Sequence, residues 1–260
     1  MNELDTLRAE LDAWGAAGLD ATLWWRDDDA EAPTPAVLRM LDLSVQHSAP
    51  VFIAVVPAPA VDDLSRPVLD CPTAVPVQHG FAHTDHSPKD VKGKWELGLH
   101  RPKDAVVGEL RDGSVRMAAL FGDRVCPMLG PPWNRIDPDL FNDLPGLGFD
   151  VISVFGPRAR ADVAPGLTMI NGHCDIIAWK RDRTFIGAEK TANRLAEHLA
   201  ARRRGDVDAA EPTGLLTHVW AQDELAWQTL SEVLALVDRH PAARWLGQDE
   251  LMPAQGRKLS

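Results

Sequence analysis

Short apolar runs alternate with longer amphipathic segments along this chain, and this alternation constrains the fold more than any other feature. Ala21–Trp25 and Val51–Val56 have the length and the aromatic or β-branched content of strands. Ala188–Arg204 and Asp223–Arg239 repeat their apolar residues with the period of a helix. Strand and helix alternate about seven times, which predicts parallel strands joined by helical crossovers in an α/β fold.

The other expected elements continue this alternation. Thr34 can cap a helix that has Pro35 at its first position. The segment Pro102–Phe121 has a helical pattern that Asp112-Gly113 could interrupt. A further helix is expected near the start of the chain, where Leu4, Leu7, Leu11 and Trp14 share one face. The remaining expected strands are Val75–Gln78, Arg124–Leu129, Phe149–Phe155, Leu167–Ile170, Gly214–Thr217 and Arg244–Leu246.

Polar clusters directly follow several of the expected strands. Asp27-Asp28-Asp29 comes after the first strand, His79 ends a later one, and His218 ends a strand near the carboxyl terminus. In a βα barrel, the carboxyl ends of the strands form the edge at which the active site is built. No segment is long enough to serve as a linker, so we expect residues 1–260 to form a single barrel domain.

Charge and cysteine content disfavour several classes of partner. The chain has 27 Lys and Arg against 38 Asp and Glu, a formal net charge of −11, so nucleic acid is not an expected partner. No run approaches the ~18 uncharged apolar residues of a membrane span, and the acidic N-terminal segment lacks the apolar stretch of a secretory signal. Cys71, Cys126 and Cys174 are odd in number and far apart, as is typical of reduced thiols. We therefore expect a cytoplasmic protein with no membrane partner; the sequence does not predict its oligomeric state.

His79 and His83 have the spacing of two ligands of one metal ion. Histidines at this spacing can point the same way on a helical turn, although such pairs also occur in proteins without a metal. Gly80 stands where zinc proteases of the HExxH type carry glutamate, which disfavours that class. A carboxylate from Asp27-Asp28-Asp29 could complete the site. The acidic run could instead be a solvated loop or helix cap, but adjacent carboxylates repel one another unless a cation or a shared proton relieves them.

Five motifs, taken in order, resemble the signature of a known enzyme family. They are Asp28-Asp29, His79–His83, Pro131–Asn134, Asp175–Trp179 and Leu216–His218. An aspartate pair, an HxxxH, a Pro-aromatic loop, an Asp/Trp loop and a Leu-x-His occur in this order in the polysaccharide deacetylase family (carbohydrate esterase family four). The resemblance covers residues 28 to 218. It implies a distorted (β/α)7 TIM-like barrel and metal-dependent removal of acetyl groups from N-acetylated sugars or oligosaccharides.

The resemblance also implies roles for individual residues. Asp28 is expected to be the general base, and Asp29 is expected to bind the metal together with His79 and His83. A register one residue earlier, with Asp27 as the base and Asp28 as the ligand, stays open. The expected cofactor is one divalent metal ion, with Zn²⁺ favoured, which would lower the pKa of its bound water from about 15.7 to roughly 7.

Residues at later strand ends complete the expected site. His218 is expected to protonate the leaving amine, and the alternative is a buried structural histidine. A backbone N–H near Trp133 would hold the oxyanion, and Asp175 and Trp179 belong to the Asp/Trp loop beside the substrate. The tryptophans that could stack on sugar rings, or could simply pack within the protein, are Trp95, Trp133, Trp179 and Trp220.

Two residues depart from the family's pattern. Gly130 stands where the third motif usually begins with arginine, and Ala178 where the fourth usually has a second aspartate. Arg26 lies two residues before Asp28, so both side chains share one face of an extended strand, and Arg26 could replace the missing cation. Asp175 could likewise hold the imidazole of the acid in place of the missing carboxylate.

The sequence thus predicts a cytoplasmic, single-domain, metal-dependent amide hydrolase that acts on N-acetylated sugars. One alternative keeps the metal and changes the substrate to a small non-carbohydrate amide. A cytoplasmic enzyme does not meet intact cell-wall polymers, and the usual arginine is missing, which motivates this alternative. The other alternative is a sugar-binding relative that no longer catalyses.

Overall fold

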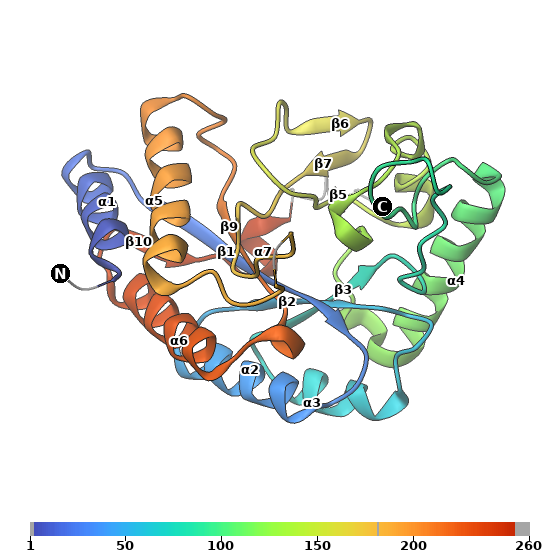
Figure 1. The fold of residues 1–260 in the computed structure, drawn as a ribbon, viewed down its shortest axis with the longest axis horizontal. Coiled ribbons are helices and arrows are strands. Elements are labelled where there is room, and N and C mark those ends of the chain that lie inside the picture. Colours follow the sequence, from blue (N-terminus) through green and yellow to red (C-terminus); the bar gives the residue numbers. More distant parts are fainter. Residues whose placement is uncertain (1–2, 181, 253–260) are drawn as a thin grey trace, which may run out of the picture.

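A sheet of parallel strands curls through the centre of the molecule, with helices on its outer side (Figure 1). The strands are β1 (Ala21–Ala30), β2 (Val51–Val55), β3 (Ala74–His79), β4 (Met128–Gly130), β5 (Val151–Ile152), β6 (Asp162–Ala164), β7 (Leu167–Met169), β8 (Cys174–Asp175), β9 (Thr213–Thr217) and β10 (Ala243–Trp245). The computed structural model describes residues 3–180 and 182–252, and the other positions of the expected 1–260 domain lie outside the described residues. In the sheet, β1 lies between β2 and β9, and β3, β4 and β5 follow on the β2 side.

The stretch that contains β7 and β8 closes the barrel. On one side, the Gly172 N–H donates a hydrogen bond to the Val154 carbonyl just beyond β5, at 3.0 Å. On the other side, the His173 N–H donates to the Gly214 carbonyl of β9, at 2.8 Å. Among the described strands, β6 alone runs antiparallel to its neighbour, as a hairpin with β7. The α/β class and the distorted (β/α)7 TIM-like barrel that the sequence predicts are therefore confirmed.

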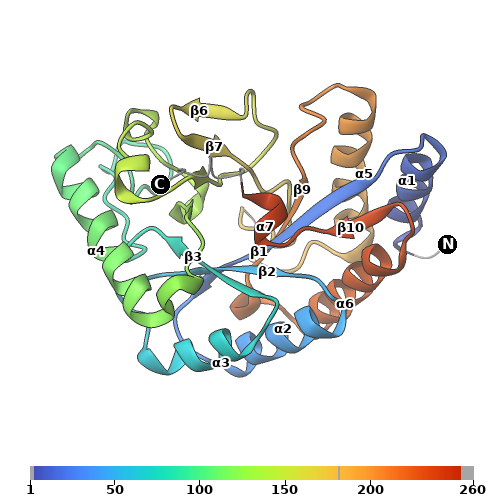
Figure 2. The same cartoon turned by 180° about the vertical axis from the view of Figure 1, so that it is seen from behind.

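Helices cover the outer side of this barrel (Figures 1 and 2). They are α1 (Asp5–Ala16), α2 (Pro35–Gln46), α3 (Ser65–Asp70), α4 (Lys103–Phe121), α5 (Ala188–Arg204) and α6 (Glu224–Arg239). The short helix α7 (Gln248–Leu251) lies apart from them, with Leu251 packed in a cluster that includes Trp24 and Phe52. Short 3-10 helices lie at Asp62–Leu64, Gly122–Arg124, Pro132–Asn134, Pro138–Leu140, Pro145–Leu147 and Val219–Ala221. α1 lies against α5, where the Trp14 indole N–H donates to the Leu199 carbonyl at 3.2 Å. The amphipathic faces that the sequence predicts are thus buried against the barrel or a neighbouring helix.

α4 continues through Asp112-Gly113 without the interruption that the sequence allowed. Gly113 is buried where α4 meets β3, and a Cβ there would collide with the Gln78 amide. The same amide donates to the Leu110 carbonyl at 3.0 Å. The glycine therefore permits close packing of the helix on the strand rather than a break.

The strand expected at Phe149–Phe155 is limited to the two residues of β5, and two further strand predictions differ from the structure at one end. β1 does not stop at Trp25 but continues to Ala30, and it pairs with both β2 and β9. The acidic run is therefore part of the barrel and not a solvated loop. The strand expected at Arg124–Leu129 is wrong at its start, because a 3-10 helix ends at Arg124 and β4 begins only at Met128. The Arg124 side chain donates there to the Ala74 carbonyl at 2.9 Å, a contact that a sequence pattern does not reveal.

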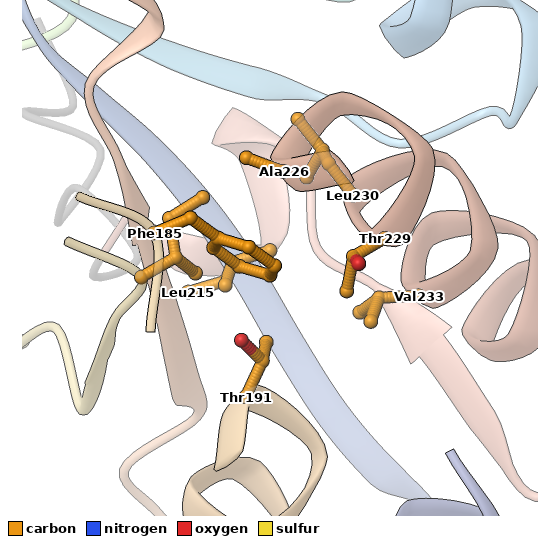
Figure 3. A pocket seen from close by; sticks show the side chains of 8 residues that line it. Phe185, Thr191, Leu215, Ala226, Thr229, Leu230 and Val233 are labelled. Carbon is orange, nitrogen blue, oxygen red and sulfur yellow. The ribbon is translucent and has the colours of Figure 1, made fainter. Parts of the chain in front are cut away.

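A small cavity lies between β9 and the helices α5 and α6 (Figure 3). Its lining carries no charged group, and the Thr191 hydroxyl donates to the Gly187 carbonyl at 2.9 Å. The cavity is therefore a gap in the packing of helices on the barrel rather than a polar binding site. The lining residues are Ile176, Phe185, Thr191, Leu215, Ala226, Thr229, Leu230 and Val233.

The three cysteines are buried and unpaired, as expected for reduced thiols. Burial raises the pKa of Cys126 and of Cys174 to about 12, so both are neutral thiols near pH 7. None of the helices in the described part of the chain has the length and apolar character needed to cross a membrane.

Candidate active site

Polar side chains from three strand ends meet at the carboxyl edge of the barrel. β1 carries Asp28 and Asp29 near its end, β3 ends at His79, and His218 directly follows β9. In the sheet these strands lie in the order β3-β2-β1-β9, and all are parallel. Their carboxyl ends therefore lie along one edge, which is where βα barrels build active sites.

A bulge near the end of β1 directs two successive aspartates toward this edge. The pairing of β1 with β2 shifts register between Asp27 and Ala30, and Asp29 has a φ of 73°. In a regular strand, successive side chains point to opposite faces. The left-handed conformation at Asp29, which Asp tolerates better than most residues, breaks that alternation. The Asp29 side chain therefore faces the histidines, whereas the Asp28 side chain lies beside Arg26.

Asp29, His79 and His83 form a compact group of potential metal ligands. The Asp29 Oδ1 atom lies 3.2 Å from His79 Nε2 and 3.1 Å from His83 Nε2. One ligand atom from each residue lies within 4.8 Å of the other two. Two imidazole nitrogens and one carboxylate oxygen suit Zn²⁺ and leave a coordination position for water. These residues therefore fit a divalent metal ion.

The electrostatics of this group favour a cation. Burial by itself would raise the pKa of Asp29, but hydrogen bonds from His79 and His83 hold that pKa far below its usual range. Burial likewise opposes protonation of His79, but the charges of Asp28 and Asp29 outweigh it and raise the His79 pKa. The Asp29 shift keeps this carboxylate ionised, and the His79 shift reflects the negative charge of Asp28 and Asp29 beside the imidazole. A bound cation would meet the same negative charge.

The buried carboxylate of Glu96 holds the loop that follows His79 and carries His83. It accepts hydrogen bonds from three backbone N–H groups of that loop, at Phe81 (3.1 Å), Ala82 (2.7 Å) and Thr84 (3.3 Å). Glu96 could not be predicted from the sequence, because a single glutamate in a loop has no motif around it. A usable signal was Gly80, whose φ is 56° and where a Cβ would collide with the Glu96 carboxylate.

Two of the four tryptophans proposed as stacking residues contact the potential metal ligands. The Trp220 indole N–H donates to Asp29 Oδ2 at 3.0 Å, which leaves Oδ1 facing the histidines. The Trp133 ring lies 4.4 Å from the His83 ring, edge to face. Trp95 packs instead against a histidine of its own loop.

Arg26 holds Asp28 in a two-pronged ion pair. Its Nε atom lies 2.8 Å from Asp28 Oδ1, and its Nη2 atom donates to Asp28 Oδ2 at 3.0 Å. Both side chains are almost fully buried. The guanidinium also donates to the Ser153 hydroxyl at 2.7 Å and to Asn134 Oδ1 at 2.5 Å. Such a fork fixes the direction of the Asp28 carboxylate.

Asp27 points to a different region of the barrel. Its Oδ2 atom accepts a hydrogen bond from the Thr217 hydroxyl at 2.5 Å and another from the Val219 N–H at 3.1 Å. Burial, together with the neighbouring charges of Asp28 and Asp29, raises the pKa of Asp27 well above its usual range. The alternative register, with Asp27 as the base, does not match this placement.

His218 lies between Asp28 and Asp175. Its Nε2 atom is 3.9 Å from Asp28 Oδ2, and its Nδ1 atom is 3.8 Å from Asp175 Oδ1. The Trp179 ring packs edge-on at 4.6 Å, and its N–H donates to Asp175 Oδ2 at 2.6 Å. Burial raises the pKa of Asp175, and the charge of His218 opposes that rise. Trp179 also lies 5.7 Å from Trp220, so the tryptophans link the two sides of the site.

The barrel is similar to solved structures of deacetylases and carbohydrate esterases. A protein from Mycobacterium smegmatis assigned to the polysaccharide deacetylases has a TM-score of 0.67 at 16% identity, over 90% of this chain and 89% of its own. A family 4 carbohydrate esterase from Streptomyces lividans has a TM-score of 0.58 at 11% identity, over 90% and 97%. The catalytic domain of a peptidoglycan N-acetylglucosamine deacetylase from Eubacterium rectale has a TM-score of 0.56 at 10% identity, over 88% and 88%. No protein-family model and no curated protein sequence matches the chain.

This chain has the polysaccharide deacetylase fold. The resemblance drawn from five short motifs is thereby confirmed at the level of the fold. The five motifs lie at or directly after the carboxyl ends of β1, β3, β4, β8 and β9.

The two departures from the family pattern lie beside residues with the missing chemistry. A Cβ added at Gly130 would lie 3.6 Å from Arg26 Nη1, so the Arg26 guanidinium fills the space next to the position of the family's arginine. On the other side of the deacetylase fold, Ala178 offers no carboxylate, but the Asp175 carboxylate lies beside His218. The candidates for both missing groups, Arg26 and Asp175, thus lie at other positions of this chain.

A second histidine cluster lies near the amino ends of β8 and β9. The rings of His173 and His198 stack with centroids 3.4 Å apart, next to the buried Glu211. The Gly214 N–H donates to His173 Nδ1 at 2.9 Å, so a neutral His173 carries its proton on Nε2, 3.4 Å from Glu211. That nitrogen is then a donor and not a metal ligand. Burial lowers the pKa of His198 to about 3, so its ring is neutral near pH 7. The cluster lies at the edge of the deacetylase fold that is associated with stability.

Proposed function

We propose that this protein is a metal-dependent deacetylase that hydrolyses the acetamido group of N-acetylated sugars or oligosaccharides. The observation that carries the proposal is the pair Asp28 and His218, 3.9 Å apart, beside the group formed by Asp29, His79 and His83. Amide hydrolysis needs a base for water, an acid for the leaving amine and a stabiliser of the oxyanion. The similar structures that are named as deacetylases support the choice of an acetamido substrate.

Asp28 is the proposed base. It removes a proton from the water that attacks the acetyl carbonyl, and Arg26 keeps its carboxylate aimed in one direction. A divalent ion held by Asp29, His79 and His83 would supply Lewis-acid polarisation of the carbonyl and of the water. A correctly placed general base typically contributes about a hundredfold to ten-thousandfold to the rate.

His218 is the proposed acid. It gives a proton to the amide nitrogen as the carbon–nitrogen bond breaks, so acetate and a free amine are released. The Asp175 carboxylate lies 3.8 Å from the far ring nitrogen, so an acidic group faces the side of the ring that is turned away from Asp28. Asp28 and His218 then recover their starting states by exchanging the proton with solvent.

Aromatic residues around these groups are proposed to bind the sugar. Trp179 and Trp220 are 36% and 56% exposed, so part of each ring is free to stack on a ligand. A backbone N–H near Trp133 is proposed to hold the oxyanion beside the metal group, because the Trp133 ring already contacts His83.

Acetate release from N-acetylglucosamine and its oligomers, measured with protein loaded with Zn²⁺ or Co²⁺, tests the proposal. The expected result is metal-dependent release that Asp28→Asn abolishes while the metal remains bound. Absence of acetate release from every N-acetylated sugar, with one metal ion bound per chain, would overturn it.

The same screen separates the alternatives. Hydrolysis of small non-carbohydrate amides, but not of acetamido sugars, would support the small-amide hydrolase. Saturable oligosaccharide binding without acetate release would support the non-catalytic sugar-binding relative. A cytoplasmic location, a single domain over residues 1–260 and the absence of a nucleic-acid partner stay predictions.

A further inference from the structure

The ring of His218 is held only loosely by its polar neighbours. Its Nε2 and Nδ1 atoms lie 3.9 Å from Asp28 Oδ2 and 3.8 Å from Asp175 Oδ1, distances beyond a hydrogen bond. Nδ1 has no hydrogen-bond partner among the described residues. The direction of the ring must therefore come from its backbone and from packing against Trp179.

One carboxylate oxygen binds the residues on both sides of His218, through a side-chain hydroxyl and a backbone N–H. Asp27 Oδ2 accepts from the hydroxyl of Thr217, the residue before, at 2.5 Å. The same atom accepts from the N–H of Val219, the residue after, at 3.1 Å. Asp27 is completely buried, and so is Thr217.

The direction of each hydrogen bond follows from a third residue. The Trp25 indole N–H, which can only donate, lies 2.8 Å from the Thr217 hydroxyl oxygen. The Thr217 oxygen therefore accepts from Trp25, and its own hydrogen is free to point at Asp27. The hydrogen bonds therefore run in one direction, from Trp25 to Thr217 and from Thr217 to Asp27. They end on the Asp27 oxygen that also accepts from the Val219 N–H.

These contacts are more than a link between two strands. Backbone pairing already joins β1 to β9 as far as the pair Asp27–Thr217, where the ladder ends. The Val219 N–H lies beyond that end, where the chain leaves the strand and His218 has a φ of −143°. A buried carboxylate is costly unless it is well bonded, whereas an apolar side chain would fill the same space without that cost. The Asp27 carboxyl group is therefore best explained by the Thr217 hydroxyl and the Val219 N–H that it binds.

We propose that Asp27 and Thr217 are positioning residues that fix the backbone of His218 and thereby aim its ring at the leaving nitrogen. This inference rests on the proposed deacetylase function for its consequence in turnover, but its structural part does not. A displacement of about 1 Å in a catalytic group can cost about a hundredfold in rate. Asp27 thus differs in role from Asp28 and Asp29, although the three residues are adjacent.

Thr217→Val is the main test, because it removes the hydroxyl and keeps the shape of the side chain. Thr217→Ser is its matched control, because it keeps the hydroxyl. We expect Thr217→Val to lower kcat by about tenfold to a hundredfold, with KM and the bound metal per chain unchanged. Thr217→Ser should stay within about threefold of the unmodified protein. Asp27→Asn keeps one oxygen acceptor for both bonds and should also retain most of kcat.

A readout that does not need activity accompanies the kinetics. In protein labelled with ¹⁵N-histidine, the ring signals of His218 are assigned by their loss in His218→Gln. We expect Thr217→Val to broaden or shift these signals and Thr217→Ser to leave them in place. Altered ring signals in a protein with no turnover on any acetamide would sustain the positioning role and remove the proposed function. Unchanged ring signals and unchanged kcat in Thr217→Val would overturn the positioning role.

Discussion

The two sides of the candidate site are held together in different ways. On the metal side, formed by Asp29, His79 and His83, both imidazole nitrogens lie within 3.2 Å of one carboxylate oxygen. On the acid side, formed by His218 and Asp175, the closest polar contacts of the imidazole are 3.8 to 3.9 Å long. The metal side is therefore specified by side chains that converge on one point, and the acid side by the backbone beneath the ring.

This difference matches what each side is proposed to do. A metal site must keep its ligands at nearly fixed distances throughout the reaction, so convergent side chains and the Glu96 carboxylate under the loop suit it. A general acid must have a ring nitrogen that can donate its proton to the leaving group. An imidazole without a short side-chain hydrogen bond suits this role. Substitutions on the two sides should therefore separate metal binding from proton transfer.

The largest effect is expected when the metal side loses both imidazoles. The double variant His79→Ala, His83→Ala leaves Asp29 as the remaining ligand, and one carboxylate does not hold Zn²⁺ firmly. Bound metal should fall from one equivalent to almost none, and turnover by at least about a thousandfold. Metal content measured by atomic absorption checks this, with His173→Ala as the control from the other histidine cluster. Full metal occupancy in the double variant would show that the site is elsewhere.

The next effect separates two adjacent aspartates. Asp28→Asn removes the proposed base but no metal ligand, so metal should remain while turnover falls by at least about a hundredfold. Asp29→Asn removes a ligand and should lose the metal itself. Parallel measurements of metal content and acetate release distinguish the two. The opposite pattern would reverse the roles of Asp28 and Asp29.

A smaller effect is expected at the ion pair that orients the base. Arg26→Lys keeps the positive charge but cannot grip both oxygens of Asp28, so kcat should fall about tenfold with metal retained. Arg39→Lys is a matched control, because Arg39 also grips both oxygens of a carboxylate, that of Glu224, but at the surface. Steady-state kinetics of both variants measure the difference. Equal rates in the two variants would remove Arg26 from the mechanism.

The sequence predicts the fold well because the fold depends on repeated local patterns. Apolar runs and helical periods placed most elements within a few residues, including α5 at Ala188–Arg204, whose bounds agree with the structure. The differences occur where a distant contact determines the local conformation. Gly113, which local rules treat as a helix breaker, stays helical because α4 packs closely on Gln78.

The candidate site could be predicted only in part, for a related reason. Parallel strands bring their carboxyl ends together, so motifs at those ends indicated which residues would meet. The bulge that gives Asp29 its φ of 73° has no local signature in a run of three aspartates. The partners of Asp27 are even less accessible to sequence reasoning, because Thr217 lies 190 residues away.

The smallest predicted effect is a change in pH dependence on the acid side. The Asp175 carboxylate faces the ring nitrogen of His218 that is turned away from Asp28, and attraction to a charged His218 opposes the rise in the Asp175 pKa that burial causes. Protonated His218 is the active form of the acid, and the alkaline limb of the pH–rate profile marks its loss. Asp175→Asn removes the charge and keeps the shape, so the proton should be lost at lower pH. The alkaline limb should therefore move down by up to about one pH unit.

The control for this last variant lies within the same contact. Trp179→Phe removes the indole N–H that donates to Asp175 Oδ2 but leaves the carboxylate charge in place. It should change KM for the sugar more than the position of the alkaline limb, since the Trp179 ring is partly exposed beside the site. An alkaline limb that stays in place in Asp175→Asn would mean that the carboxylate does not act on His218. In that case, the hydrogen bonds that Asp27 accepts from Thr217 and Val219 would remain as the contacts proposed to position His218.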